Sequence, residues 1–303
     1  MSRHRRTIEE EDESFFISMT DIMVGLLFIF ILIIVYFAIQ SQVEAKKYED
    51  LVSNDEKRRD IDQYNTGVLK QRDNLLRWLS EYLSKEGYDL DESDFSNGIL
   101  RLPEGVLFDS GKFMIKPNSR SEKAVKVLAK AFSEILPCSV MTSDGLPFKP
   151  NSYCNNAKYG NNYSAFVNSI FIEGHTDNIP VTRTLFNAPS IDSNLKLSAM
   201  RSANTIAAMS KNRPSIDNFY GPIDSSGKTF DQLKKYQTVI AGSAYGKTRP
   251  IVDNKTRTTR AKNRRIDIRI LMYEAKTNDS MNFMKKLGVT PGGNNADQRA
   301  STF

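Results

Sequence analysis

The chain has 303 residues, a formal net charge of +6, two histidines and two cysteines. So few histidines and cysteines exclude a metal centre built from repeated Cys and His ligands. The positive charge would permit nucleic-acid binding, but much of it falls in one short stretch at residues 255–265, so we expect no nucleic-acid partner. The length leaves room for one domain of ordinary size, a connector and a single membrane span.

An apolar run at residues 15–39 follows a charged tail at residues 1–14. A helix of that length covers about 37 Å at about 1.5 Å per residue, enough to cross about 30 Å of hydrocarbon. The run is longer than the apolar part of a signal peptide and no clear cleavage site follows it. We therefore predict a single-pass transmembrane anchor, with a cytoplasmic amino terminus because positive charge is slightly greater before the run than after it.

Asp21 is the one acidic residue within the apolar run. An ionised carboxylate inside a bilayer costs at least about 2.5–3.5 kcal/mol, so such a residue normally faces protein or water and serves an ion pathway. The alternative is a carboxylate that reaches the interface, because Asp21 lies only about two turns into the run. Asp21 is thus a candidate carrier of H⁺ or Na⁺, and we expect no other cofactor.

Residues 40–94 are expected to form a helical stalk or linker. Residues 44–59 are charged almost throughout and either extend the membrane helix or form a solvated linker. Further along, apolar residues recur at three, four and seven positions, which predicts an amphipathic helix. They are Val68, Leu75, Leu76, Leu79, Tyr82 and Leu83. Such a helix would pack on the following domain or on a second copy of itself.

Residues 95–275 alternate between strand-like and helix-like patterns, which predicts a two-layer α/β sandwich. Strands are expected at residues 99–102, 167–173, 236–241 and 265–273, and helices after Pro117 and at residues 197–209. A stretch rich in Ser, Asn, Pro and Gly at residues 137–168 reads as an insertion, and residues 276–303 as a flexible tail.

Cys138 and Cys154 both lie in the insertion. In an oxidising compartment they would form a disulfide, and closing a loop of this length is worth about 3 kcal/mol in the chain-entropy model. The alternative is a pair of buried or free thiols.

Four motifs occur in order along the predicted sandwich: FIEGHTD at 171–177, NLKLSAMR at 194–201, GSAYG at 242–246 and RAKNRRIDI at 260–268. Together they resemble the OmpA-like peptidoglycan-binding domain. The chain departs from that pattern at Ser202, where the family usually has Ala, and in its long insertion. The resemblance implies a domain that holds the diaminopimelate residue of the cell-wall peptide without hydrolysing it.

By motif match, Asp177 should hold the ammonium group of diaminopimelate and Arg201 its carboxylate, because a planar guanidinium suits a carboxylate bidentately. Asn194 would position either the loop or the peptide, and Arg264 matches another recurrent position of the family. A surface ion pair is the alternative for Asp177, Arg201 and Arg264. His175 is expected to be a structural hydrogen-bonding residue. No metal ligand set, nucleophile elbow, phosphate loop or catalytic pair is found, so we expect no enzyme.

The solitary Asp21, a stalk and an OmpA-like domain together resemble the B subunit of ion-driven rotary stators, the MotB family. That resemblance implies an inner-membrane protein with a periplasmic domain, and a B homodimer surrounded by five copies of a MotA-like or ZorA-like A subunit. The segment at residues 18–27 looks closer to ZorB of the Zorya antiphage defence system. A flagellar-type MotB stator and a passive OmpA-like peptidoglycan tether remain the alternatives.

Overall fold

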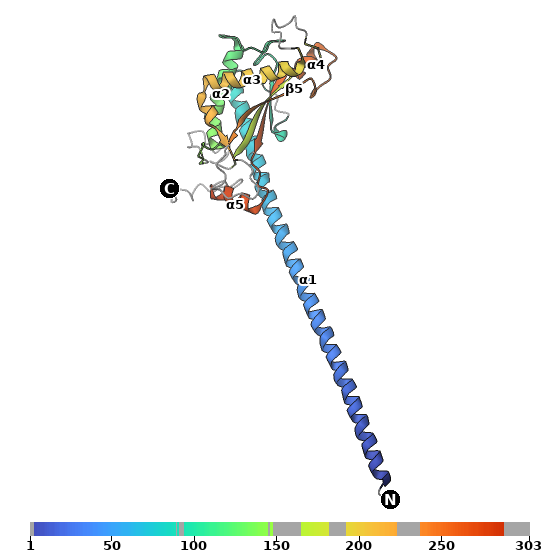
Figure 1. Ribbon diagram of the computed structural model, residues 1–303. Helices are drawn as coiled ribbons and strands as arrows, with labels where there is room; N and C mark the ends of the chain where they lie inside the picture. Colours follow the sequence, from blue (N-terminus) through green and yellow to red (C-terminus); the bar gives the residue numbers. More distant parts are fainter. Residues whose placement is uncertain are drawn as a thin grey trace. The chain divides into compact units, whose positions relative to one another are not determined.

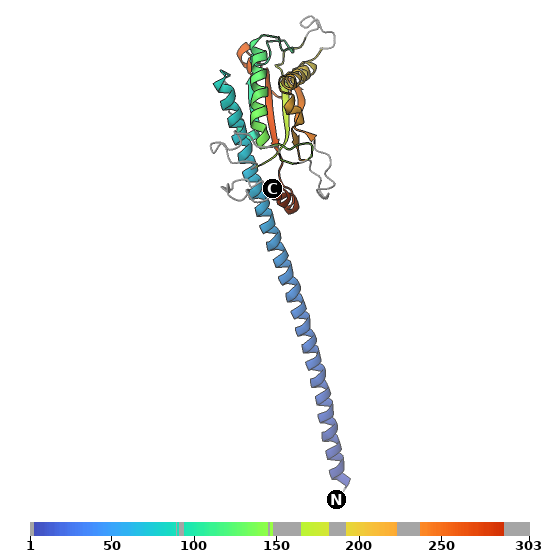
Figure 2. The same cartoon turned by 90° about the vertical axis from the view of Figure 1, so that its left-hand side faces the viewer.

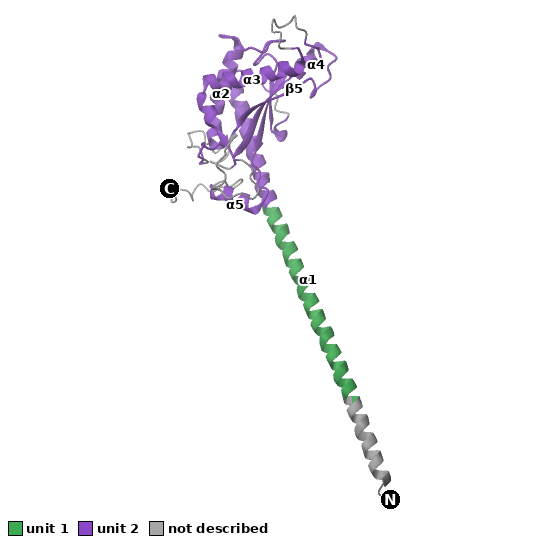
Figure 3. Ribbon diagram, viewed as in Figure 1, with its two compact units in different colours: residues 1–60 green, residues 61–303 purple. Residues whose placement is uncertain are grey.

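The structure is a computed structural model that describes residues 3–88, 90, 94–144, 146–147, 165–181, 192–222 and 237–287, with side chains at Met19 and from residue 21 onward apart from Gln237. Two compact units are present, residues 1–60 and residues 61–303 (Figure 3). Helix α1 spans Arg3–Lys85 and contributes to both units (Figure 1). The stalk predicted by the sequence is therefore helical from the apolar run onward.

The first unit carries the predicted membrane span. Within the described part of the chain, α1 is the one helix that is long and apolar enough to cross a membrane. Its large apolar side chains between Ile22 and Ile39 are exposed. So long an apolar surface is unfavourable in water and suits lipid tails. The predicted apolar amino-terminal helix is confirmed.

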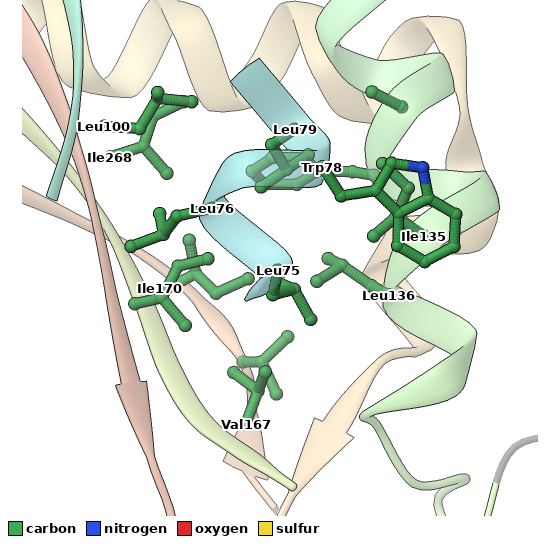
Figure 4. Packing of buried hydrophobic residues seen from close by; sticks show 14 of the residues in the cluster. Leu75, Leu76, Trp78, Leu79, Leu100, Ile135, Leu136, Val167, Ile170 and Ile268 are labelled. Atoms are coloured by element: carbon green, nitrogen blue, oxygen red, sulfur yellow. The ribbon is translucent and has the colours of Figure 1, made fainter. Parts of the chain in front are cut away.

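From Ile61 onward, α1 belongs to the core of the second unit. The side chains of Val68, Leu76 and Leu79 are fully buried. Figure 4 shows Leu76 on the same side of the sheet as Ile170 and Ile268. The amphipathic helix therefore packs on its own domain, which was one of the two arrangements left open by the sequence. The sequence analysis placed the start of the domain at residue 95. In the structure the compact unit begins at residue 61, because these side chains complete its core.

Four strands form the main sheet, in the spatial order β1, β6, β2, β5. They are β1 (Ile99–Pro103), β2 (Val167–His175), β5 (Ile240–Gly246) and β6 (Arg265–Met272). β6 pairs antiparallel with β1 and β2, whereas β2 and β5 are parallel. Successive side chains of a strand point to opposite faces, so Ile170 and Ile268 face the core while Glu173 and Asp267 face the other side. The strands predicted at residues 99–102, 167–173 and 265–273 are confirmed.

Three helical segments cover the apolar face of the sheet: residues 61–85 of α1, α2 (Arg120–Ile135) and α3 (Asn194–Asn212) (Figure 2). Ser119 caps α2 by accepting a hydrogen bond from Glu122 N, and Ser193 caps α3 by accepting one from Lys196 N. The structure thus confirms the two-layer α/β sandwich.

The smaller elements lie around this sandwich. They are the 3₁₀ turns η1 (Phe95–Asn97), η2 (Leu136–Cys138) and η4 (Pro214–Asn218), the two-stranded sheet of β3 (Tyr220–Gly221) and β4 (Gln237–Thr238), and the short helices α4 (Arg257–Asn263) and α5 (Asn278–Lys286). Met281 and Met284 of α5 are buried in the core. The tail predicted from residue 276 therefore includes a structural helix, and only residues beyond 287 fall outside the described part.

The strand expected at residues 236–241 differs most from the structure. It divides into β4 and the longer β5, which continues through the small residues Ala241 to Ala244 and ends with Tyr245 and Gly246. Small residues have low strand propensity, so the sequence pattern did not show this extension. Their size has a packing reason: a Cβ atom on Gly242 would lie 2.8 Å from Ser202 Oγ of α3. Helix α3 therefore lies closely against β5.

Candidate functional site

The predicted site residues meet where β2 ends and β6 begins. Asp177 follows β2, Arg264 precedes β6, and Arg201 comes from α3. Gly174 allows α3 to approach, because a Cβ atom there would lie 2.2 Å from Ser198 O. Gly246, with a φ of 52°, ends β5 and donates its N–H to Ser198 Oγ at 2.9 Å. The motif glycines thus bring the charged side chains together.

Arg264 bridges two carboxylates at the centre of the site. Its NH1 donates to Asp177 Oδ2 at 2.6 Å and its Nε donates to Glu104 Oε2 at 2.5 Å. Burial alone would lower the pKa of Arg264, but the hydrogen bonds to Asp177 and Glu104 outweigh it and the pKa is raised. Arg264 therefore forms two ion pairs at the partly buried centre of the cluster.

Arg201 is buried, with 2 % of the residue exposed, whereas an arginine in a surface ion pair would be exposed to solvent. Its Nε donates to Lys112 O at 2.8 Å, and its guanidinium lies 5.6 Å from the ring centre of Phe108. Burial lowers the pKa of Arg201 to about 10, so the guanidinium stays charged at neutral pH. Its NH2 lies 3.9 Å from Glu104 Oε1. In this structure the guanidinium of Arg201 therefore contacts residues of the segment 104–112.

Asn194 is the first residue of α3 and contacts the turn that follows β2. Its Nδ2 donates to Asp177 O at 3.1 Å and to Ile179 O at 3.0 Å. Asp177 Oδ1 in turn accepts from Ile179 N at 3.0 Å. Of the two roles considered for Asn194, the structure shows the positioning of the loop.

Glu104, which sequence reasoning did not single out, completes the cluster. It lies in the connection between β1 and α2, and its side chain is 11 % exposed. Its Oε1 is buried and accepts no hydrogen bond from the described residues. Apart from a charged residue placed directly after a strand, the sequence carried no signal for it. The space lined by Glu104, Arg201 and Arg264 is about 10 Å³, room for about one water molecule.

His175 lies on the opposite face of the sheet from the core, in a second charged network. Its Nε2 is 3.2 Å from Asp267 Oδ2, and its ring stacks on Tyr245 with 5.3 Å between centres. Glu173, His175 and Asp267 place their potential ligand atoms within 4.8 Å of one another. Both carboxylates are already paired, however: Glu173 with Arg269 at 2.7 Å and Asp267 with Arg265 at 3.0 Å. Neither ring nitrogen of His175 makes a hydrogen bond with the described residues, so the hydrogen-bonding role expected for it is not seen; its ring instead packs on Tyr245.

Asp21 lies in the first unit and is exposed on α1. Its role as an ion carrier stays a prediction. Cys138 lies at the end of η2 and is disulfide-bonded. Cys154 lies outside the described residues, so the pairing of the two cysteines also stays a prediction.

Replacing Cys154 by Ser should lower the free energy of unfolding by about 3 kcal/mol under oxidising conditions, because the cross-link of a loop of about this length restricts the unfolded chain. Denaturant unfolding of the full chain in detergent, with and without a reductant, measures the difference. The Cys138→Ser, Cys154→Ser variant is the control and should not respond to the reductant. Two freely alkylated thiols in the native protein would contradict the disulfide.

The fold and the site define a class of protein: an α/β domain joined to a helix that can cross a membrane. Four neighbouring charged side chains lie at the strand ends of this domain, from Glu104, Asp177, Arg201 and Arg264. No protein-family model matches the chain. Over 194 residues, the chain is 26 % identical to motility protein B of Bacillus subtilis (strain 168). This alignment covers 63 % of the chain and 52 % of the relative, so the chain spans about half the length of the curated relative.

Two solved structures are also similar. A MotB-like protein from Desulfovibrio vulgaris is 18 % identical with a TM-score of 0.41, over 71 % of this chain and 98 % of that one. The periplasmic domain of Helicobacter pylori MotB is 19 % identical with a TM-score of 0.35, over 62 % of this chain and 83 % of that one.

Proposed function

We propose that this chain is the wall-anchored B subunit of an ion-driven motor of the inner membrane, with no catalytic activity of its own. The observation that carries the proposal is the combination, in one chain, of Asp21 in a membrane-crossing helix and the charge cluster around Asp177 and Arg264. A passive wall tether needs the second feature but not the first. The similarity to motility protein B supports the same class of protein.

In this proposal, Asp21 carries the coupling ion. An incoming H⁺ or Na⁺ neutralises a charge that is costly in low dielectric, and its release restores that charge. The membrane potential supplies about 2.3 kcal/mol per charge per 100 mV. Each cycle changes how the B helix packs against the surrounding A subunits, of which we propose five around a B homodimer. The amino terminus would lie in the cytoplasm and the second unit in the periplasm.

Wall attachment then makes the A ring the moving part, because it stops the B dimer from turning. The site offers both charges that a diaminopimelate centre requires: a carboxylate at Asp177 for the ammonium, and guanidinium groups for the carboxylate. We assign the ligand's carboxylate to Arg201 or Arg264, of which Arg264 is the more accessible, with 15 % of its side chain exposed against 3 % for Arg201.

Among motors, we place the chain with the B subunit of the Zorya antiphage defence system, on the residues that surround Asp21. A flagellar stator is the second candidate, favoured by the name of the curated relative. The neighbouring genes distinguish the two. An A subunit with a large tail beside helicase-like and nuclease-like genes indicates defence, whereas flagellar genes indicate motility.

The wall-binding part is tested with Asp177→Ala in the full chain. We expect binding to diaminopimelate-type peptidoglycan to fall by about 2–5 kcal/mol, because the substitution removes the ammonium partner and leaves the Arg264 charge without one of its two carboxylates. Co-sedimentation of the detergent-solubilised protein with purified cell wall measures the loss.

Asp144→Ala is the matched control, because this carboxylate is exposed and lies outside the segment at residues 104–112. It should bind the wall as the unmodified chain does. Equal sedimentation of Asp177→Ala and the unmodified chain would refute the site.

A further inference from the structure

The position of Arg264 shows where a cation sits in this site. Its guanidinium lies between Asp177 and Glu104 and donates to both. With about 10 Å³ of free space, the site cannot hold a second cation beside it. A ligand's ammonium group can reach these carboxylates only if Arg264 withdraws from them.

Arg264 is also the arginine that can move. Arg201 is fixed by the backbone carbonyls of Lys112 and Asp109 and by the ring of Phe108. Arg264 donates to side chains only and lies at the rim of the site, with 15 % of its side chain exposed. Once displaced, its guanidinium would remain near enough to meet the carboxylate on the same carbon as the incoming ammonium.

Glu104 has an acceptor that this arrangement leaves unused. Its Oε1 is buried and accepts no hydrogen bond from the described residues, and the Arg201 NH2 lies 3.9 Å away from it. A buried carboxylate oxygen without a hydrogen bond is costly, and an ammonium group has three donors to offer. The buried carboxylates of the network on the opposite face of the sheet, Glu173 and Asp267, are already paired with Arg269 and Arg265.

We propose that Glu104 is a second ammonium-binding residue, which receives the ligand's ammonium together with Asp177 while Arg264 moves to the ligand's carboxylate. This inference rests on the proposed wall-binding function and deepens it. The exchange conserves charge: two carboxylates and two guanidinium groups accept a ligand centre that carries one charge of each sign. The ligand class is therefore an amino-acid centre with a free ammonium and a free carboxylate.

The test compares two soluble wall fragments that differ only at the ammonium: a diaminopimelate-containing muropeptide, and the same muropeptide acetylated on that nitrogen. The full chain in detergent should bind the free amine more tightly. Glu104→Gln, which preserves size and an oxygen for Arg264, should weaken binding of the free amine by about tenfold or more and leave the acetylated form within about twofold. Asp177→Asn should show the same selectivity for the amine.

Asp144→Asn is the control, because this carboxylate is exposed and lies outside the segment at residues 104–112, and it should change neither affinity. Glu104→Asp retains the charge at a shorter reach and should fall between the unmodified chain and Glu104→Gln, and thermal unfolding of each variant verifies the fold. An equal loss for both fragments would mean that Glu104 only positions Arg264, and unchanged binding would remove it from the site. Either result overturns the inference while the wall-binding function stands. Failure of the unmodified chain to bind either fragment would overturn both.

Discussion

A chain that begins at residue 99 should not fold, whereas a chain of residues 61–287 should fold and unfold cooperatively. The shorter chain lacks the part of α1 that fills the core against the sheet. The buried apolar side chains of α1 that are lost are Tyr64, Val68, Leu75, Leu76, Trp78, Leu79 and Leu83. At about 1.5–3 kcal/mol each, their burial is worth about 10–20 kcal/mol, comparable to or larger than the net stability of about 5–15 kcal/mol of a typical domain. Circular dichroism during thermal unfolding measures the difference.

Point substitutions in the full chain separate this packing from a general effect on the helix. Leu79→Ala should cost about 2–5 kcal/mol, because the side chain is fully buried. Leu51→Ala, on the same helix but 62 % exposed, should change the stability of the second unit little. A cooperative transition in the chain of residues 99–287 would show that α1 is not part of the folding unit.

Asp21→Asn should abolish motor function while the complex still assembles and binds the wall. The amide preserves the size and much of the hydrogen bonding of the carboxylate, but it can no longer take up and release an ion at this position. The expected readout is loss of phage protection, or of motility if the chain serves a flagellum, with the protein at its normal level in the membrane.

Asp50→Asn is the matched control, since Asp50 lies on the same helix, beyond the apolar run, and is exposed. It should leave activity unchanged. Full activity of Asp21→Asn at matched expression would exclude the motor assignment and leave the wall tether. Loss of both activity and assembly would instead identify Asp21 as a packing residue.

Most of the fold could be predicted because its signals are local. Alternating apolar residues mark β1, β2 and β6, and capped apolar stretches at helical spacing mark α2 and α3. The amphipathic face of residues 61–85 was equally visible, but such a pattern does not name the surface that it contacts. For that reason the boundary of the second unit could not be placed. The extension of β5 was missed because its residues Ala241 to Ala244 are small, and α5 because it is only nine residues long.

The candidate site could also be predicted only in part. Asp177, Asn194, Arg201 and Arg264 were named by their motifs, and the structure brings them together around one cluster. Their contacts could not be read from the motifs: Arg201 contacts the segment at residues 104–112, while Arg264 holds Asp177. Glu104 has no motif of its own and reaches the site only because β1 lies beside β6.

The sequence by itself determined the local properties of this protein. These are an apolar helix with one carboxylate, the order of strands and helices, and the residue types required to bind an ammonium and a carboxylate. Only the tertiary structure decided which charges meet, because Glu104 and Arg264 are 160 positions apart in the chain. Contacts at such separation depend on how the strands are ordered in the sheet and on what each helix face covers. Neither is encoded in the periodicity of any single segment.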